Sequence, residues 1–307
     1  MAQTLKTSGH LLEMFMPYRS DEAKMIKVLK RAAGFGFYSN VELGIFFDRE
    51  NRKEVRRILE ANGLSATTFC TPYVKDQKLA LCDLDESGRR KSVDLAKKLA
   101  EYAHEMGYVH FGVPSGDDPG PVFRGLAKDA LTESMKEIAD YIAPMGMNLT
   151  IEPLDRYVYK KQLIGPMEET VVWFKQLHDQ CPNTFIHWDS AHEALAGIDL
   201  FKSLDLASPY LGQFHLCDAI VDPKEPCFGD LHMDVAHAPE WTTEGFLTPD
   251  VGASILKKVA SFDKPEGVDQ VYVAVEVLGH PGDDLWLKES NCRAFLKKCF
   301  EIAEMDV

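Results

Sequence analysis

The sequence predicts a single (β/α)8 barrel, and three observations support this prediction. Eight short apolar runs alternate with amphipathic stretches along the 307 residues, which is the pattern of a parallel sheet whose strands are joined by helices. No Gly- or Ser-rich linker divides the chain, so residues 1–307 are expected to form one domain. A barrel of this kind needs about 250 residues, and the chain is long enough to supply them.

The apolar runs give the expected strands, and the stretches between them give the expected helices. Strands are predicted at residues 9–15, 38–46, 64–71, 108–113, 147–153, 184–189, 211–217 and 271–278. Helices are predicted at residues 21–33, 49–61, 92–106, 123–145, 167–180, 199–208, 249–262 and 284–304. Gly63 and Gly107 follow two of these helices, where glycine supplies a left-handed cap. Periodicity does not distinguish a closed sheet from an open one, so a doubly wound sheet remains the structural alternative.

Charge and composition narrow the classes of partner. The net charge of −14 disfavours a nucleic acid or an anionic membrane, because both reward a basic face. The chain has no apolar stretch of about 18 residues and no apolar run after a basic N-terminal segment, so we expect a cytoplasmic protein. The seven cysteines include no CxxC pair, which favours reduced thiols over a disulfide framework or a zinc ribbon. A small neutral or metal-chelated substrate fits these features.

A polar side chain stands near the end of each of the last four predicted strands. These residues are Glu152 in LTIEP, Asp189 in FIHWD, His215 in GQFHLC and Glu276 in VYVAVEVLG. Successive side chains of a strand point to opposite faces, so the bulky apolar neighbours can pack on the outer helices while these four point toward the barrel axis. Taken singly, each acid is more simply a helix cap or loop anchor, and the histidine a hydrogen-bonded core residue. Four such residues in register are harder to explain in that way.

Three carboxylates buried together would repel one another unless a cation compensates them. The sequence therefore predicts one divalent metal ion bound by Glu152, Asp189, His215 and Glu276. Three carboxylates and one imidazole leave room for two further oxygens in an octahedron, which suits Mn²⁺, Mg²⁺ or Co²⁺ better than a closed structural zinc. Mn²⁺ is our first choice, with Mg²⁺, Co²⁺ and Zn²⁺ as the alternatives.

Four segments, taken in order, resemble the xylose isomerase-like barrels over essentially the whole chain. They are EPLDRY at residues 152–157, HWDSAH at 187–192, FHLCDA at 214–219 and VEVLG at 275–279. The similar branch contains D-tagatose 3-epimerase, D-psicose 3-epimerase, hydroxypyruvate isomerase and inosose dehydratase. The resemblance implies that the matching Glu, Asp, His and Glu hold the metal, that Glu152 and Glu276 also serve as acid and base, and that His192 binds substrate. It also suggests a dimer or a tetramer.

These residues predict a metal-dependent sugar isomerase or epimerase that acts on a small sugar or polyol. Carboxylate-mediated proton transfer would pass through a metal-stabilised enediolate. A proton returned to the opposite face gives an epimer, and one returned to the neighbouring carbon gives an aldose–ketose isomer. An inosose-type dehydratase is the alternative, because dehydration of a keto-polyol begins with the same enediolate.

Several positions leave the substrate open. Val221 stands where the sugar epimerases place an arginine, about six residues after the strand-seven histidine. Arg156 is a substrate-binding candidate, or else it pairs with an acidic neighbour. Lys160 and Lys161 are most simply a solvated loop, with a substrate carboxylate or phosphate as the other reading. Glu42 is expected either to bind a substrate hydroxyl or to form a salt bridge to a neighbouring strand.

The long loop at residues 218–249 raises a less favoured alternative, an endonuclease IV-like phosphodiesterase. Asp230 and His232 in GDLHMD have the spacing of that enzyme's third-metal ligands. The remaining ligands are missing, because TTFCTPY has no histidine and His110 is displaced from the position before the proline. Asp230 and His232 are then expected to cover the active site from the loop.

Overall fold

The computed structural model describes residues 4–235 and 245–307, which form a closed barrel of eight parallel strands in the order β1 to β8. The strands are β1 (Leu5–His10), β2 (Asn40–Glu42), β3 (Ser65–Phe69), β4 (His110–Val113), β5 (Asn148–Ile151), β6 (Thr184–Asp189), β7 (Leu211–Cys217) and β8 (Val271–Glu276). The last strand pairs with the first, in register from Leu5 opposite Val271. The predicted barrel is confirmed, and the open doubly wound alternative is wrong.

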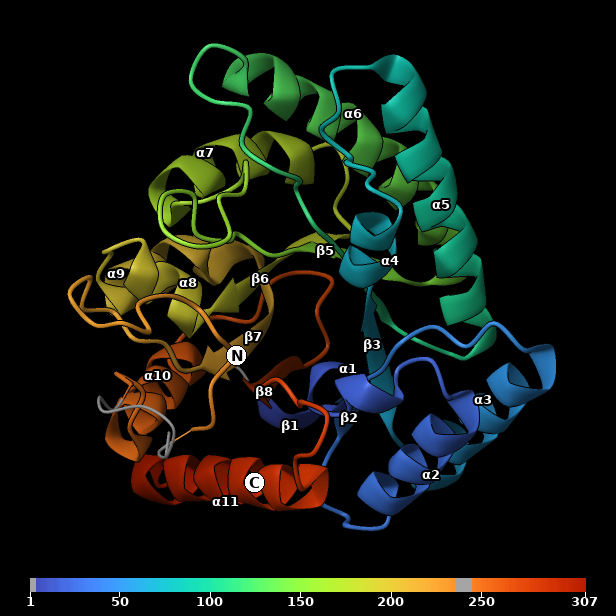
Figure 1. Ribbon diagram of the computed structural model, residues 1–307, viewed down its shortest axis with the longest axis vertical. Helices are drawn as coiled ribbons and strands as arrows, with labels where there is room; N and C mark the ends of the chain where they lie inside the picture. The colour runs from blue at the N-terminus through green and yellow to red at the C-terminus, as the bar shows by residue number, and fades with distance from the viewer. Residues whose placement is uncertain (1–3, 236–244) are drawn as a thin grey trace.

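The longer helices surround the strands (Figure 1). The helices are α1 (Leu11–Met14), α2 (Glu22–Ala33), α3 (Arg49–Asn62), α4 (Thr71–Asp76), α5 (Glu86–Glu105), α6 (Arg124–Ile142), α7 (Met167–His178), α8 (Ser190–Leu195), α9 (Leu200–Ala207), α10 (Pro249–Ala260) and α11 (Leu285–Ala303). Gly63 follows α3 with a φ of 62°, as predicted for a left-handed cap. Helix α5 begins six residues earlier than expected, because the Asp85 side chain accepts a hydrogen bond from the backbone N–H of Gly88. No described helix is apolar over enough residues to span a membrane.

The first strand is the clearest error of the sequence prediction. A strand was expected at residues 9–15, but β1 ends at His10 and Leu11–Met14 is a short helix. Leu11, Leu12 and Met14 are buried, so their apolar run reflects burial rather than strand conformation. The observed strand, LKTSGH, places polar side chains inside the barrel. Because it has no apolar run, the hydrophobic pattern does not predict it.

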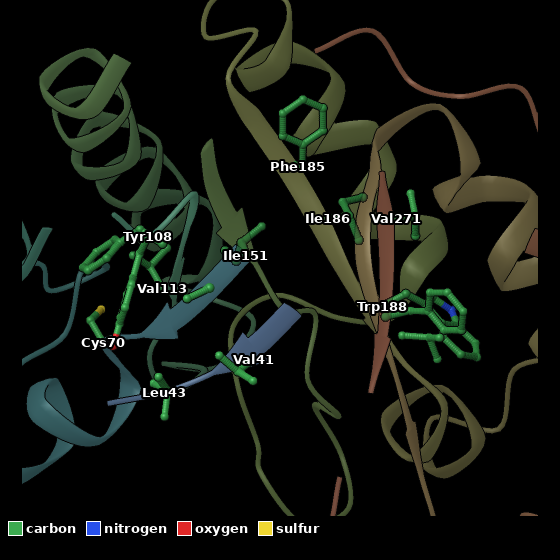
Figure 2. Packing of buried hydrophobic residues seen from close by; sticks show 14 of the residues in the cluster. Val41, Leu43, Cys70, Tyr108, Val113, Ile151, Phe185, Ile186, Trp188 and Val271 are labelled. Carbon is green, nitrogen blue, oxygen red and sulfur yellow. The ribbon is translucent and has the colours of Figure 1, made fainter. Parts of the chain in front are cut away.

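Side chains alternate along the strands, which separates an apolar layer between strands and helices from a polar network inside the barrel. Apolar side chains such as Trp188 and Phe214 pack in the large buried cluster, part of which is shown in Figure 2. Polar side chains fill part of the barrel itself and bond to one another. Asn40 donates from Nδ2 to the Ser8 Oγ at 2.9 Å, and the Thr67 hydroxyl donates to the Gln213 Oε1 at 3.1 Å. This network lies beneath the strand ends that carry the candidate site.

Candidate metal centre

The four predicted ligands come together at the carboxyl ends of neighbouring strands. Asp189 and Glu276 are the last residues of β6 and β8, Glu152 directly follows β5, and His215 lies in β7. One ligand atom from each residue lies within 4.8 Å of the others. Asp189, His215 and Glu276 are buried, and the Glu152 side chain is 21% exposed. This is the arrangement that a single metal ion requires.

Asp189 shows how a helix cap and a ligand can be the same residue. Its Oδ1 accepts hydrogen bonds from the backbone N–H groups of Ala191 and His192, which caps α8. Its Oδ2 is buried and has no hydrogen-bond partner among the described residues. A buried carboxylate oxygen without a donor is costly, and a cation would satisfy it.

The carboxyl groups at the ends of β5 and β6 have raised pKa values. Burial, together with the negative charge of Glu276, raises the pKa of Glu152 to about 7 and that of Asp189 to about 6. A divalent ion would oppose both effects, since it supplies positive charge to all the carboxylates at once. The donor set of three carboxylates and an imidazole therefore fits a divalent metal.

Glu276 has a different environment, because three histidines surround it. Its Oε2 lies 2.8 Å from the His215 Nδ1, and its Oε1 lies 3.3 Å from the His10 Nε2 and 3.1 Å from the His232 Nδ1. Burial raises the pKa of Glu276, but the charges of His232 and His215 and the hydrogen bonds from His10 and His215 outweigh it, so the pKa lies well below its usual range. This carboxylate is therefore held ionised.

Glu42 supports the site from β2 and is fully buried. Its Oε2 lies 2.8 Å from the Nε2 of His215 and 3.2 Å from the Nδ1 of His10. Its Oε1 accepts hydrogen bonds from the Ser8 Oγ and the Gln213 Nε2. Glu42 was expected either to bind a substrate hydroxyl or to form a salt bridge, and the structure has the salt bridge. This contact holds a proton on the His215 Nε2, so the Nδ1, which lies 2.8 Å from the Glu276 Oε2, is the nitrogen that would exchange its proton for a metal ion.

His192 lies on α8, beside Glu152. Its Nε2 is 3.5 Å from the Glu152 Oε1, and its Nδ1 is 3.8 Å from an oxygen of Asp155 and of Asp230. Burial lowers the pKa of His192, but Asp155 and the other surrounding carboxylates raise it to about 9. His192 lines the small cavity at the site, where a substrate oxygen can reach it.

Arg156 lies apart from the site, and its ion-pair alternative is what the structure has. Its guanidinium donates to the Glu169 Oε2 at 2.8 Å and to the Leu163 carbonyl at 2.7 Å. The side chain is buried in these contacts, and it does not line the cavity at the site. We therefore leave Arg156 out of the proposed substrate contacts.

Lys160 corrects the expectation of a solvated loop. Its Nζ lies 2.8 Å from both the Asp230 Oδ2 and the His232 Nε2, and the residue lines the cavity at the site. Asp230 and His232 come from the part of the 218–249 loop that the structure describes, and residues 236–244 of that loop lie outside the described residues. An ammonium group thus contacts both residues that resemble endonuclease ligands, and these two also lie 3.0 Å from each other. His110, at the start of β4, packs edge-on against Tyr272 within the barrel.

Sequence reasoning missed His10 and Glu13, and it did not place His232 against Glu276. The misassigned first strand hid His10, because a strand ending at residue 10 would have pointed to it. Glu13 lies 2.6 Å from the His232 Nδ1, across a sequence separation that no local pattern reports. The D-x-H motif of Asp230 and His232 was the one sequence feature that pointed to a role for His232 at the site.

The chain belongs to the xylose isomerase-like TIM barrel family, whose family model matches residues 29–245. Among curated proteins, L-ribulose 3-epimerase from Methylomonas sp. (strain DH-1) is 28% identical over 101 residues, which are 33% of this chain and 34% of that protein. The match thus spans about a third of the length of this curated relative.

Solved structures of low sequence identity share the fold. The D-psicose 3-epimerase from Clostridium cellulolyticum H10, solved with D-tagatose, has a TM-score of 0.70 at 15% identity, over 97% of this chain and 99% of that one. The IOLI protein with a bound zinc atom has a TM-score of 0.67 at 14% identity, over 97% and 98% of the two chains. The resemblance stated from the sequence is confirmed at the level of family and fold.

Proposed function

We propose that this chain is a metal-dependent sugar epimerase or isomerase in which Glu152 and Glu276 move protons to and from a ketose. The observation that carries the proposal is the convergence of these two carboxylates with Asp189 and His215 within 4.8 Å at the barrel mouth. That the curated relative and a solved neighbour are sugar 3-epimerases supports the same class of reaction.

Glu152, Asp189, His215 and Glu276 would hold one divalent ion, with Mn²⁺ as our first choice. When bound, such an ion polarises a carbonyl and so makes the neighbouring C–H more acidic. Two observations support this assignment: the Asp189 Oδ2 has no hydrogen-bond partner among the described residues, and the His215 Nδ1 faces the Glu276 carboxylate at 2.8 Å. Glu42 would keep His215 in the correct tautomer.

The two glutamates supply the proton transfers. One removes a proton from the carbon beside the carbonyl, and the other returns a proton. Return to the opposite face of that carbon gives the epimer, and return to the neighbouring carbon gives the isomer. His192, close to Glu152, would hydrogen bond a substrate oxygen on that side of the cavity. Assembly as a dimer or tetramer stays a prediction.

Solvent-deuterium incorporation tests the proposal. A panel of unphosphorylated ketoses and inososes is incubated in D₂O with the Mn²⁺-loaded protein, and again after chelation of the metal. We expect metal-dependent label at the carbon beside the carbonyl, and the product separates epimerase, isomerase and dehydratase. Absence of label from every compound, with one metal bound per chain, would overturn the proposal.

A further inference from the structure

Two cavities share a wall beside the candidate metal centre. The inner one has a volume of about 70 Å³ and contains Glu152, His192, His215 and Glu276. The outer one, here called the vestibule, has about 480 Å³ and is lined by residues that include Met16, Tyr159, Asp234, His280 and Lys288. Glu13, Lys160 and His232 line both cavities. The vestibule thus adjoins the proposed reaction site.

The two cavities differ in size, so they would hold different parts of one ligand. Ligand pockets measure about 300–1,000 Å³, so the inner cavity is too small for a whole sugar while the vestibule falls in that range. The inner cavity takes the reacting end of a substrate. The vestibule has room for a further group attached to it.

Tyr159 gives the vestibule an aromatic wall. Its side chain is 50% exposed, although the backbone beside it is fixed by a hydrogen bond from the Tyr159 N–H to the buried Asp155 carboxylate at 2.6 Å. Gly229 lies directly against the ring, with a φ of 141°, and a Cβ at that position would be 2.8 Å from the Tyr159 Cδ2. Backbone that only glycine allows thus supports the ring near Cδ2. The Lys160 ammonium lies 5.7 Å from the ring centroid, and half of the side chain stays exposed to the vestibule and solvent. Such a ring is a platform for the C–H face of a sugar.

The charges around the vestibule disfavour an anionic group. Lys160 is paired with Asp230 at 2.8 Å, and Lys288 is paired with Asp234 at 2.8 Å and with Asp283 at 3.3 Å. Glu13 adds a further carboxylate to the wall. A phosphate or carboxylate would meet ammonium groups that are already neutralised, whereas sugar hydroxyls can donate to these carboxylates and accept from these ammonium groups.

We propose that the vestibule binds a second, uncharged sugar ring stacked on Tyr159, so that the preferred substrate is a keto sugar that carries a glycosyl group. The assignment of the inner cavity rests on the function proposed above, whereas the ring-binding site is defined by the vestibule residues alone. The two parts can therefore be tested separately.

Binding tests the ring site without turnover. Saturation-transfer NMR with methyl glycosides of glucose, galactose and mannose is run on the metal-loaded protein and on two variants. We expect saturation of ring protons for at least one glycoside in the wild type, its loss in Tyr159→Ala and its retention in Tyr157→Ala. Tyr157 is the matched control, because it is a 62% exposed tyrosine of the same loop that does not line the vestibule. Absence of transfer from all three glycosides, or equal loss in both variants, would overturn the site.

Turnover tests the substrate class. We compare kcat/KM for D-fructose and for 6-O-α-D-glucopyranosyl-D-fructose, which keeps the carbons around the carbonyl free. We expect at least tenfold preference for the glucosyl compound, reduced to less than threefold in Tyr159→Ala. Equal kcat/KM for the two compounds in the wild type would remove the assigned substrate class while leaving the ketose chemistry intact. Failure of the proposed function would instead show as no exchange with any ketose, beside normal glycoside binding.

Discussion

The two halves of the barrel contribute differently to the candidate site. The second half, from β5 to β8, brings the four ligand candidates to the strand ends. The first half brings His10 and Glu42, which contact Glu276 and His215, and beneath them Ser8, Asn40 and Thr67. In the proposed mechanism, one half therefore carries the reacting groups and the other fixes their orientation and proton positions.

The largest effect is expected in the second half, from Glu276→Gln. The substitution keeps the size of the side chain but removes the ionised oxygen that exchanges a proton with the substrate in the proposed mechanism. We expect deuterium exchange to fall by about 100-fold or more, together with weaker metal binding. Exchange is measured at saturating Mn²⁺, with the exposed Glu168→Gln as the control. Full turnover in Glu276→Gln would exclude the two-carboxylate mechanism.

The first half is tested by Glu42→Gln. A carboxylate has two oxygens that accept hydrogen bonds, whereas an amide has one oxygen and an NH₂ group that donates. With its NH₂ group facing the His215 Nε2, the substituted side chain would favour the His215 tautomer that carries the proton on Nδ1. We expect metal affinity to fall by about 10- to 100-fold, measured by calorimetric titration of Mn²⁺.

Thr67→Val is the matched control for Glu42→Gln. It disturbs the same inner network but does not contact His215, because Thr67 bonds to Asn40 and Gln213. Its metal affinity should stay within a factor of two of the wild type. Equal affinities for all three proteins would show that the first half has no part in positioning the metal ligands.

The sequence predicted the two halves unequally for a physical reason. Glu152, Asp189, His215 and Glu276 each follow an alternating apolar pattern, so strand periodicity alone predicts their direction. Glu42 reaches His215 across 173 positions, and no local pattern specifies that pairing. Lys160 is paired because Asp230 and His232 of another loop reach it. Its own sequence neighbourhood does not specify this contact, so the sequence predicts a solvated lysine.

His192→Ala separates substrate binding from metal binding. The side chain lies 3.5 Å from Glu152 but is not in the predicted ligand set. We expect KM to rise by about tenfold, corresponding to loss of a charged hydrogen bond, with little change in Mn²⁺ affinity. Steady-state kinetics at saturating metal gives the two parameters. A loss of metal affinity comparable to that of Glu42→Gln would make His192 a positioning residue instead.

The smallest effect concerns Glu193, a buried carboxyl without the histidines that surround Glu276. Burial raises the pKa of Glu193 to about 7, and the hydrogen bond from the Ser203 hydroxyl, at 2.6 Å to Oε2, only partly opposes it. The folded state therefore retains a proton that the unfolded chain loses above its ordinary pKa of 4.5. This contribution to stability is full below about pH 4.5 and is lost as the pH rises to about 7.

Glu193→Gln tests this contrast, because glutamine keeps the acceptor for Ser203 and cannot ionise. At pH 8 the variant should be more stable than the wild type by about 1–2 kcal/mol, and at pH 5 the difference should shrink toward zero. Urea unfolding of the metal-free proteins at both pH values measures this difference, with Glu301→Gln, whose side chain is 71% exposed, as the control. A variant less stable at pH 8 would mean that an ionised carboxylate is tolerated at residue 193 without the histidine contacts that Glu276 has.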